Sequence, residues 1–192
     1  MNKPYWWYVL YVRSNTEHRV AKYVNLAFRN KGLPYELEAF SLESEQYFNS
    51  KKIKDSDKPY IRRPVFSNYI FIETNMPEME FKEAFFSIGY NSTDIIRLLT
   101  YGKSDIIALR DEERIRLEYL FRSKRCLEHS VGYIEGDRVV ITGGALVGME
   151  GNIKKINRHH RSAQIEINLF NETQTIDVAP VSYTHLRAHE TS

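Results

Sequence analysis

The residues from Gly151 to Arg161 form the stretch of the sequence whose side chains best suit binding chemistry. The stretch contains no acidic residue. In a β-hairpin such side chains gather at one end, where Lys and Arg can contact phosphates and the planes of Arg and His can stack on unpaired bases. A solvated basic turn is the alternative interpretation. The candidate RNA-binding residues are Lys154, Lys155, Arg158, His159, His160 and Arg161.

Motifs for catalysis or cofactor binding are missing from the sequence. It has no GxGxxG or other phosphate-cradling glycine motif and no HExxH zinc motif. Cys126 is the single cysteine, which excludes an internal disulfide and a multi-cysteine zinc site and fits a reducing cytoplasm. The adjacent His159 and His160 suit a basic turn better than a metal site. We therefore expect no enzyme, no catalytic residue, no cofactor and no metal.

Composition limits the classes of protein that the chain can belong to. With 192 residues, of which 42% are hydrophobic, the chain can form two compact modules. The formal net charge of +2 is too small to indicate a nucleic-acid partner by itself, so local clusters must carry that argument. No apolar run approaches the roughly 20 residues that span a bilayer, and the start lacks the pattern of a signal peptide. We expect a cytoplasmic monomer without a membrane partner.

The amino-terminal part begins with a strand followed by a helix. Trp6–Val12 is short and rich in aromatic and β-branched residues, which predicts a central strand. Ser14 and Glu17 have the spacing of a capping box, in which the two residues cap each other's backbone amides. Apolar residues then recur at helical spacing up to Lys31, and Gly32 follows at the position where helices often end.

Further periodic segments predict an α+β sandwich of the split-βαβ kind over residues 1–122. The expected elements are extended segments over 33–48, an exposed basic hairpin or loop over 49–63, a strand over 65–73, a helix from about Glu78 to Ile88, a strand over Ile95–Leu99 and a helix over Arg110–Phe121. Residues 123–133 lack clear periodicity and are expected to be a linker.

The carboxy-terminal part has the pattern of a small β-barrel. Gly136 to Val178 contains three apolar-alternating segments separated by Gly clusters and one basic turn. We expect this domain over residues 134–180. Val181 to Ser192 does not continue the pattern and resembles the in-frame translation of a sequencing-library adapter, so 181–192 is expected to be a non-native tail.

Three motifs in order resemble the NusG family of transcription factors. They are Trp7-Tyr8-Val9, the segment Arg63 to Ile72, and Gly136-Asp137-Arg138-Val139 with Gly143-Gly144 and Gly148 to Gly151. The resemblance covers roughly residues 6 to 179. It implies an amino-terminal NGN α/β sandwich domain followed by an SH3-like KOW β-barrel.

Within that family the sequence is most similar to the LoaP subfamily of antiterminators. The segments that carry this likeness are Asp94 to Leu99, Gly132 to Asp137 and Ile153 to Arg161. Two positions depart from the usual family pattern. Ser67-Asn68 replaces Pro-Gly in the turn of the second motif, and Ala145 replaces a common proline of the KOW motif.

The resemblance implies a non-enzymatic regulator of transcription elongation and antitermination. Trp7, Phe66 and Tyr69 would bind the clamp helices of RNA polymerase, with core packing as the alternative role for these aromatic residues. The KOW domain would bind a hairpin of nascent leader RNA, and the basic loop Lys51 to Arg63 would lie near upstream or non-template DNA. Two other functions stay open: a housekeeping NusG factor that links polymerase to a termination factor or ribosome, and a ribosome-associated structural KOW protein.

Overall fold

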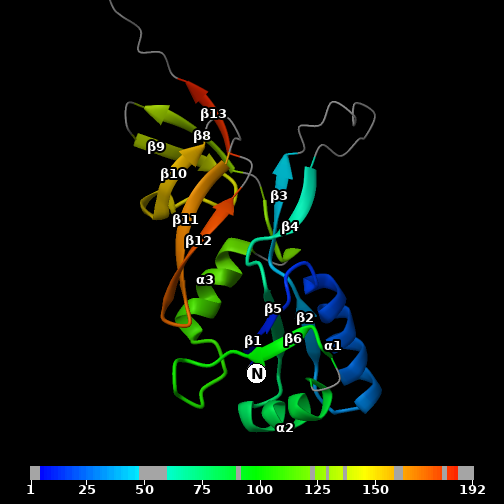
Figure 1. Cartoon of the computed structure of the whole chain (residues 1–192). Helices are drawn as coiled ribbons and strands as arrows, with labels where there is room; N and C mark the ends of the chain where they lie inside the picture. Colours follow the sequence, from blue (N-terminus) through cyan, green and yellow to red (C-terminus); the bar gives the residue numbers. More distant parts are fainter. Residues whose placement is uncertain are drawn as a thin grey trace, which may run out of the picture. The chain divides into compact units, whose positions relative to one another are not determined.

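The computed structural model describes residues 5–47, 60–89, 92–121, 124–128, 130–135, 138–157, 162–178 and 181–185 (Figure 1). The chain divides into two compact units. Unit 1 comprises Met1–Leu42, Phe66–Glu118 and Asn168–Glu172, and unit 2 comprises Glu43–Val65, Tyr119–Ile167 and Thr173–Ser192. Both helices and strands are present, so the fold is a mixed α+β fold.

Unit 1 is built on a four-stranded sheet with the order β2-β5-β1-β6. The strands are β1 (Trp6–Val12), β2 (Leu37–Phe40), β5 (Tyr69–Thr74) and β6 (Ile95–Leu98). The central strand β1 runs antiparallel to both β5 and β6, and β2 runs antiparallel to β5. Strands β1 and β2 are therefore parallel to each other with β5 between them, and β5 and β6 are parallel with β1 between them, which is the split-βαβ arrangement that the sequence predicted.

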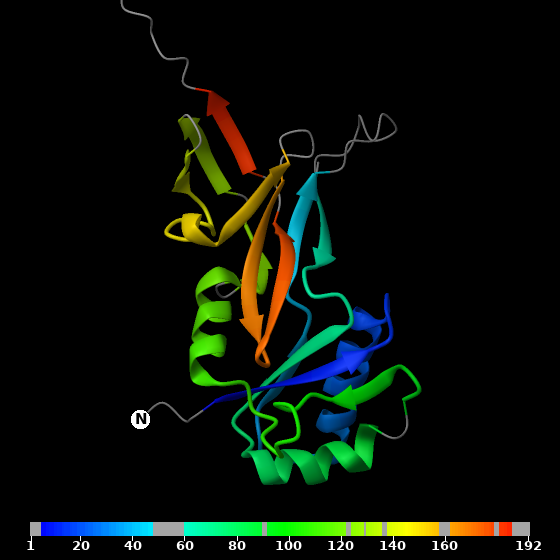
Figure 2. The same cartoon turned by 60° about the vertical axis from the view of Figure 1, so that its left-hand side comes forward.

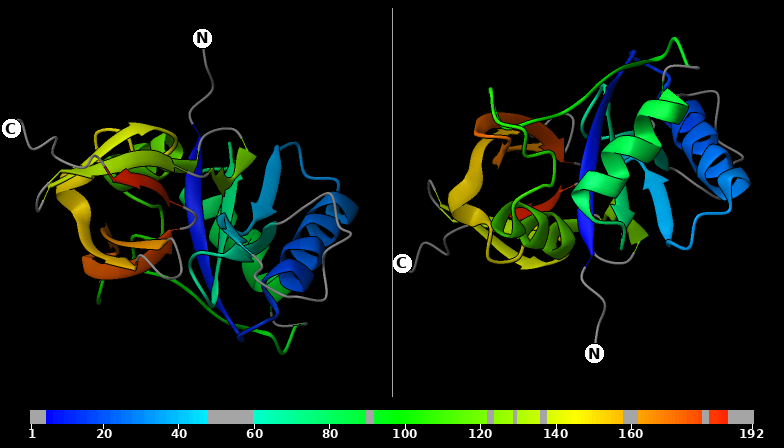
Figure 3. Two further views of the ribbon diagram at one scale, coloured as in Figure 1. Left: turned by 90° about the horizontal axis from the view of Figure 1, so that it is seen from above. Right: turned by 90° about the horizontal axis from the view of Figure 1, so that it is seen from below.

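Two helices cover one face of this sheet (Figures 1 and 3). Helix α1 (Glu17–Lys31) contributes Val20, Val24 and Phe28, whose spacing places them on one side of the helix. Helix α2 (Glu78–Gly89) contributes its buried aromatic residues and Ile88 to the same core. On β1 the inward residues are Tyr8, Leu10 and Val12, so the residues between them point to the opposite face.

Helix α3 (Asp111–Phe121) follows the sheet and continues into unit 2 at Tyr119. Its residues Leu117, Leu120 and Phe121 are buried, whereas Ile115 is exposed. Unit 2 also contains a sheet with the order β4-β3-β7, made of β3 (Glu43–Tyr47), β4 (Tyr60–Pro64) and β7 (Cys126–Leu127). Strand β7 runs parallel to β3.

The remaining strands of unit 2 form two three-stranded sheets, with the orders β13-β8-β9 and β10-β11-β12. Their strands are β8 (Ser130–Glu135), β9 (Arg138–Gly143), β10 (Ile153–Asn157), β11 (Ser162–Leu169), β12 (Glu172–Val178) and β13 (Val181–His185), with the short 3₁₀ helix η2 (Glu150–Asn152) before β10. Strands β11 and β12 form the long orange hairpin of Figure 2. Among the described strands, no pairing joins the two sheets into the closed barrel that was expected.

The observed boundaries differ from the expected domains at three places. The β3–β4 hairpin belongs to unit 2 although it lies early in the sequence, because β3 pairs with β7. The expected linker 123–133 contains β7 and the start of β8. The expected tail begins with β13, which pairs in parallel with β8. In the part of the chain that is described, no helix is long and apolar enough to cross a membrane.

Candidate functional site

Aromatic side chains gather on the sheet face opposite α1 and α2. Opposed residues of antiparallel strands project to the same face, and the register places Trp7 opposite Glu73, Val9 opposite Phe71, and Tyr11 opposite Tyr69. Phe40 of β2 lies opposite Phe71 in turn. We call the surface formed by Trp7, Tyr11, Phe40, Phe66, Tyr69 and Phe71 the aromatic face.

The rings of the aromatic face contact one another continuously. Phe71 lies at the centre, with its ring centroid 6.0 Å from that of Trp7, 6.2 Å from that of Phe40 and 5.6 Å from that of Phe66. Tyr69 is 6.4 Å from Phe66 and 5.7 Å from Tyr11, again between ring centroids. The structure therefore brings together Trp7, Phe66 and Tyr69, the three residues that the sequence singled out.

Burial divides these residues into a base and a rim. The relative exposure of Trp7 is 0% and that of Phe66 is 3%, and Phe40 and Phe71 are also buried. Tyr11 and Tyr69 are only half-buried. Loss of solvent raises the pKa of Tyr69 above its ordinary value, so its hydroxyl stays a neutral hydrogen-bonding group near neutral pH. The two tyrosines are thus held in place by buried rings while their own surfaces stay partly accessible.

The turn before β5 holds Tyr69 beside Phe66. The Tyr69 N–H donates to the Phe66 carbonyl oxygen at 3.3 Å, and Asn68 has a φ of 72°. A positive φ at the third residue is the requirement of a type II turn, which Gly usually meets and Asn tolerates. The Asn68 side chain donates to the Val12 carbonyl oxygen at 3.0 Å and to Ser14 Oγ at 2.8 Å. Asn68 therefore supplies the backbone geometry that the family's Pro-Gly pair would give.

Asn68 is also bonded to helix α1. Its N–H donates to Glu17 Oε1 at 2.8 Å, and Glu17 is buried with a relative exposure of 5%. The expected capping box between Ser14 and Glu17 is wrong, because the N-cap residue is Thr16 and it makes no side-chain capping bond. Both Ser14 and Glu17 bond the Asn68 turn instead.

Charged side chains lie at both ends of the aromatic face. At one end the Arg97 guanidinium lies over the Tyr11 ring, 5.7 Å from its centroid. At the other end the Trp7 indole Nε1–H donates to Glu73 Oε2 at 2.8 Å. Glu38 of β2 lies directly opposite Glu73. The face therefore has one basic end and one acidic end.

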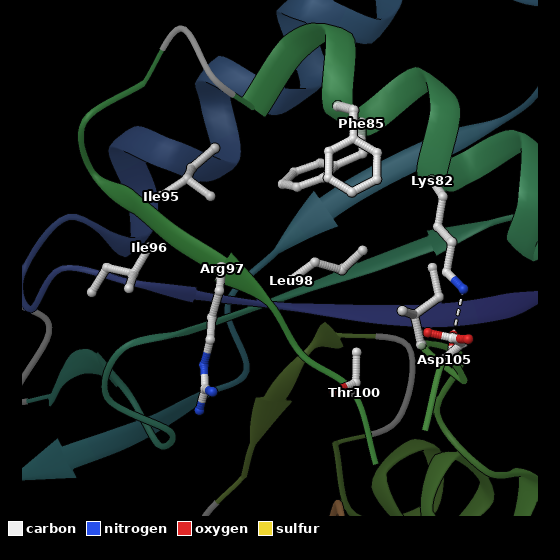
Figure 4. Close-up of a pocket in the computed structure, with 10 residues that line it drawn as sticks. Lys82, Phe85, Ile95, Ile96, Arg97, Leu98, Thr100 and Asp105 are labelled. Carbon is white, nitrogen blue, oxygen red and sulfur yellow. Dashed lines mark hydrogen bonds between the residues drawn. The ribbon is translucent and has the colours of Figure 1, made fainter. Parts of the chain in front are cut away.

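A separate pocket of about 510 Å³ lies between α2 and β6 (Figure 4). Phe85, Ile95 and Leu98 line it, and Lys82 at its edge donates to the backbone carbonyl oxygen of Asp105. In Figure 4 the guanidinium of Arg97 points away from Phe85 and Leu98. This direction agrees with the strand register, which puts Arg97 beside Tyr11 on the aromatic face.

Only two of the candidate RNA-binding residues fall within the described part of the chain. Lys154 and Lys155 are exposed on β10, and Lys154 Nζ lies 3.1 Å from Glu166 Oε2. Arg158, His159, His160 and Arg161 lie outside the described residues. Most of the basic loop Lys51 to Arg63 also lies outside them; its last residues form β4, where Arg62 is 3.4 Å from Glu45.

Sequence reasoning missed part of this site. Tyr11 lies four residues after Trp7 on β1, and Phe71 lies two residues after Tyr69 on β5, so the members of each pair project from the same face of the sheet. The period-two spacing of a strand could therefore have identified both Tyr11 and Phe71. Phe40 and Arg97 could be assigned to the aromatic face only once the pairing of β2 and β6 with their neighbouring strands was known. Within the described ranges, no group of His, Cys, Asp and Glu side chains is arranged to hold a metal ion.

Comparisons with known proteins bear on both units. A family model described as "Transcription termination factor nusG" matches residues 5–118. The transcription termination/antitermination protein NusG of Borreliella burgdorferi is 22% identical over 180 residues, covering 90% of this chain and 94% of that protein. A solved structure described as "Domain interaction in Thermotoga maritima NusG" is 16% identical and covers 91% of this chain and 93% of that chain, with a TM-score of 0.49.

Proposed function

The chain belongs to the NusG family of transcription termination and antitermination factors, and on that premise we propose that it is an antiterminator of the LoaP type. Its NGN domain binds the clamp helices of RNA polymerase through the aromatic face. Strands β8 to β13 supply a KOW domain that binds a hairpin of nascent leader RNA. Binding of both partners keeps polymerase in the elongating state on selected operons.

The observation that carries the polymerase-binding proposal is the half-buried pair Tyr11 and Tyr69 above a base of buried rings. Aromatic side chains bury a large area with little loss of conformational entropy, which suits them to anchor a helix in a groove. Trp7 and Phe66 act in this proposal as the base that fixes the two tyrosines. The edge-to-face contact between Phe66 and Tyr69 sets the position of the half-buried Tyr69 ring.

Replacing Tyr69 is the cleanest test of polymerase binding. Alanine at Phe66 or Trp7 would also remove a buried ring, and such changes typically destabilise a protein by about 3–5 kcal/mol. Tyr69→Ala should weaken binding to purified core RNA polymerase by about thirtyfold, the effect of losing roughly 2 kcal/mol at a hot spot. Biolayer interferometry measures the affinity, and circular dichroism verifies folding.

Tyr119→Ala is the matched control, because Tyr119 is an exposed tyrosine on α3 with a relative exposure of 54%. The control should bind polymerase like the wild type. Equal affinities for the wild type and a folded Tyr69→Ala variant would refute polymerase binding through this face.

The RNA-binding proposal rests on the acid-free stretch from Gly151 to Arg161 and on the exposure of Lys154 and Lys155. Each lysine or arginine that contacts a phosphate releases counterions, so affinity should fall as salt rises. Lys155→Ala should weaken binding to the leader RNA of the neighbouring operon and lower the salt dependence by about 0.7 logarithmic units per lost contact. The Arg158→Ala and Arg161→Ala double variant should lose more. Unchanged, salt-insensitive binding of that double variant would contradict the proposal.

A terminator read-through assay with purified polymerase separates the antiterminator from the alternatives. Templates with and without the leader hairpin are compared at equal protein concentration. The LoaP proposal requires read-through that depends on the hairpin. Pausing effects that ignore the hairpin would favour a housekeeping factor, and no effect on polymerase would favour a structural RNA-binding protein.

A further inference from the structure

The turn from Phe66 to Tyr69 has a shape that its own residues do not fix. In a type II turn, proline at the second position sets φ and glycine at the third adopts a positive φ without strain. Here these positions hold Ser67 and Asn68, and the φ of 72° at Asn68 costs free energy for a residue with a Cβ. The backbone bond across the turn, from the Tyr69 N–H to the Phe66 carbonyl oxygen, is long at 3.3 Å. Contacts from other segments must therefore hold the turn in place.

Those contacts come from the junction of β1 and α1, and all of them involve Asn68. The Val12 N–H donates to the Asn68 carbonyl oxygen at 2.8 Å. The Asn68 side-chain amide donates to the Val12 carbonyl oxygen and to Ser14 Oγ, and the Asn68 N–H donates to Glu17 Oε1 at 2.8 Å. Of these four bonds, the one to Glu17 has a carboxylate as its acceptor, and such bonds are roughly twice as strong as neutral ones. Glu17 is therefore the strongest of the groups that hold the turn.

Glu17 is placed to act on the turn but not to contact a partner. Its relative exposure is 5%, whereas Tyr69 is half-buried. It is the first residue of α1, whose apolar side packs in the core of unit 1, so the helix fixes the position of its carboxylate. Any effect of Glu17 on binding must pass through the turn.

We propose that Glu17 is a positioning residue for the polymerase site, because its carboxylate holds the turn in the shape that presents the Tyr69 ring to a polymerase helix. The inference rests on the proposed polymerase binding and adds a buried residue that controls its affinity. Without the Glu17 bond, the turn samples other conformations. The apparent Kd then rises in inverse proportion to the fraction of molecules that keep the binding geometry.

Two substitutions of Glu17 separate the hydrogen bond from the rest of the side chain. Glu17→Ala removes the acceptor and should weaken binding of the full chain to purified core RNA polymerase by about tenfold, as expected if about a tenth of the molecules keep the turn. Glu17→Gln keeps Oε1 as a neutral acceptor and should bind within about threefold of the wild type. Amide exchange followed by NMR should show faster exchange of the Asn68 N–H in Glu17→Ala than in Glu17→Gln.

A turn that fixes its own shape should make Glu17 dispensable. Ser67→Pro with Asn68→Gly places the type II residues in the turn, and adding Glu17→Ala to this double variant should weaken binding by less than about twofold. Val24→Ala is the matched control, because Val24 is buried on the same helix and makes no contact with the turn among the printed hydrogen bonds of Asn68. It should lower stability but keep polymerase affinity within about twofold of the wild type.

The outcomes distinguish positioning from general stability and from a failure of the polymerase contact. If Val24→Ala weakens binding as much as Glu17→Ala, or if the proline–glycine turn does not rescue Glu17→Ala, Glu17 acts only through stability and the proposal is wrong. Normal binding by Glu17→Ala beside weak binding by Tyr69→Ala would also refute the positioning role while leaving the polymerase contact intact. Normal binding by Tyr69→Ala would instead refute the polymerase contact itself, and the positioning role with it.

Discussion

Asn68 combines two roles that are usually separate, since it sets the backbone of a turn and ties that turn to two neighbouring segments. Its positive φ of 72° is tolerated by asparagine better than by most residues. Its amide group bonds the end of β1 at Val12 and the following residue Ser14. Through this turn, the position of Tyr69 is coupled to the junction of β1 and α1.

Asn68→Ala should lower the free energy of unfolding by about 1–3 kcal/mol, because alanine loses both side-chain bonds and is strained at positive φ. Asn68→Gly loses the same bonds but is unstrained, so it should be more stable than the alanine variant by about 1 kcal/mol. Urea denaturation followed by circular dichroism measures both. A glycine variant that is less stable than the alanine variant would show that the turn does not need positive φ.

The Ser14–Glu17 spacing predicted the start of α1 correctly, although the capping box on which that prediction rested does not form. The Ser14–Glu17 spacing predicted the helix start, and α1 does begin at Glu17. The two side chains nevertheless bond the Asn68 turn, which is 51 residues away from Glu17 in the sequence. Local spacing identifies residues whose side chains can form hydrogen bonds near a helix start. The tertiary structure determines which groups those side chains bond.

Elements with strong local periodicity were predictable from the sequence. Strand β1 over Trp6–Val12 and helix α1 over Glu17–Lys31 have the expected bounds, and α2 and α3 differ from expectation by about a residue at an end. Within α2, Met79 has a relative exposure of 75%, although the apolar residues Phe81 and Phe85 of the same helix are buried. Helical spacing identifies the apolar side of a helix. The elements that pack against the helix determine which residues of that side are buried.

The split-βαβ order of the sheet in unit 1 was predictable, whereas its register and the pairing of short strands were not. Strand β7 has two residues, and no periodicity can be recognised in so short a segment. The candidate site was therefore only partly foreseen: Trp7, Phe66 and Tyr69 came from motifs, whereas Arg97 and Phe40 joined them through register. The last strand, β13, pairs with β8 although its sequence does not continue the alternating pattern. Backbone hydrogen bonds are available to any sequence except at proline, so pairing alone does not require apolar alternation.

Gly132 in β8 marks a close approach of two strands. A Cβ at this position would lie 2.3 Å from the Val140 carbonyl oxygen and 3.2 Å from the Ile141 Cα. Backbone atoms of a paired strand cannot move aside without breaking the pairing. Gly132→Ala should therefore lower the free energy of unfolding by about 2 kcal/mol or more, measured by urea denaturation.

Gly151 in η2 provides the matched control for Gly132. A Cβ built there meets no atom within 4 Å. Gly151→Ala should change the free energy of unfolding by no more than about 0.5 kcal/mol. If Gly132→Ala is equally harmless, β8 and β9 do not approach each other as closely as the structure has them.

The arrangement of unit 2 changes where an isolated amino-terminal domain can be cut. The expected domain ended at residue 122, but β3 pairs with β7, with Glu43 opposite Cys126 and Ser44 opposite Leu127. Cys126 and Leu127 have relative exposures of 3% and 1%. A chain that stops at 122 therefore lacks two core residues and leaves one edge of β3 without its partner strand.

A fragment of residues 1–128 should thus be more stable than a fragment of residues 1–122. Burying a leucine contributes about 1.5–3 kcal/mol, and the Cys126 side chain and the Glu43 N–H to Arg125 carbonyl bond of 3.0 Å add to it. The expected difference is about 3 kcal/mol in the free energy of unfolding, measured by urea denaturation of both fragments. The double substitution Cys126→Ser and Leu127→Ser in the longer fragment should remove most of the gain, because it keeps the chain length and backbone but removes apolar burial. Equal stability of the two fragments would show that β7 contributes nothing to the β3–β4 hairpin, and that hairpin would then have to derive its stability from the rest of unit 2.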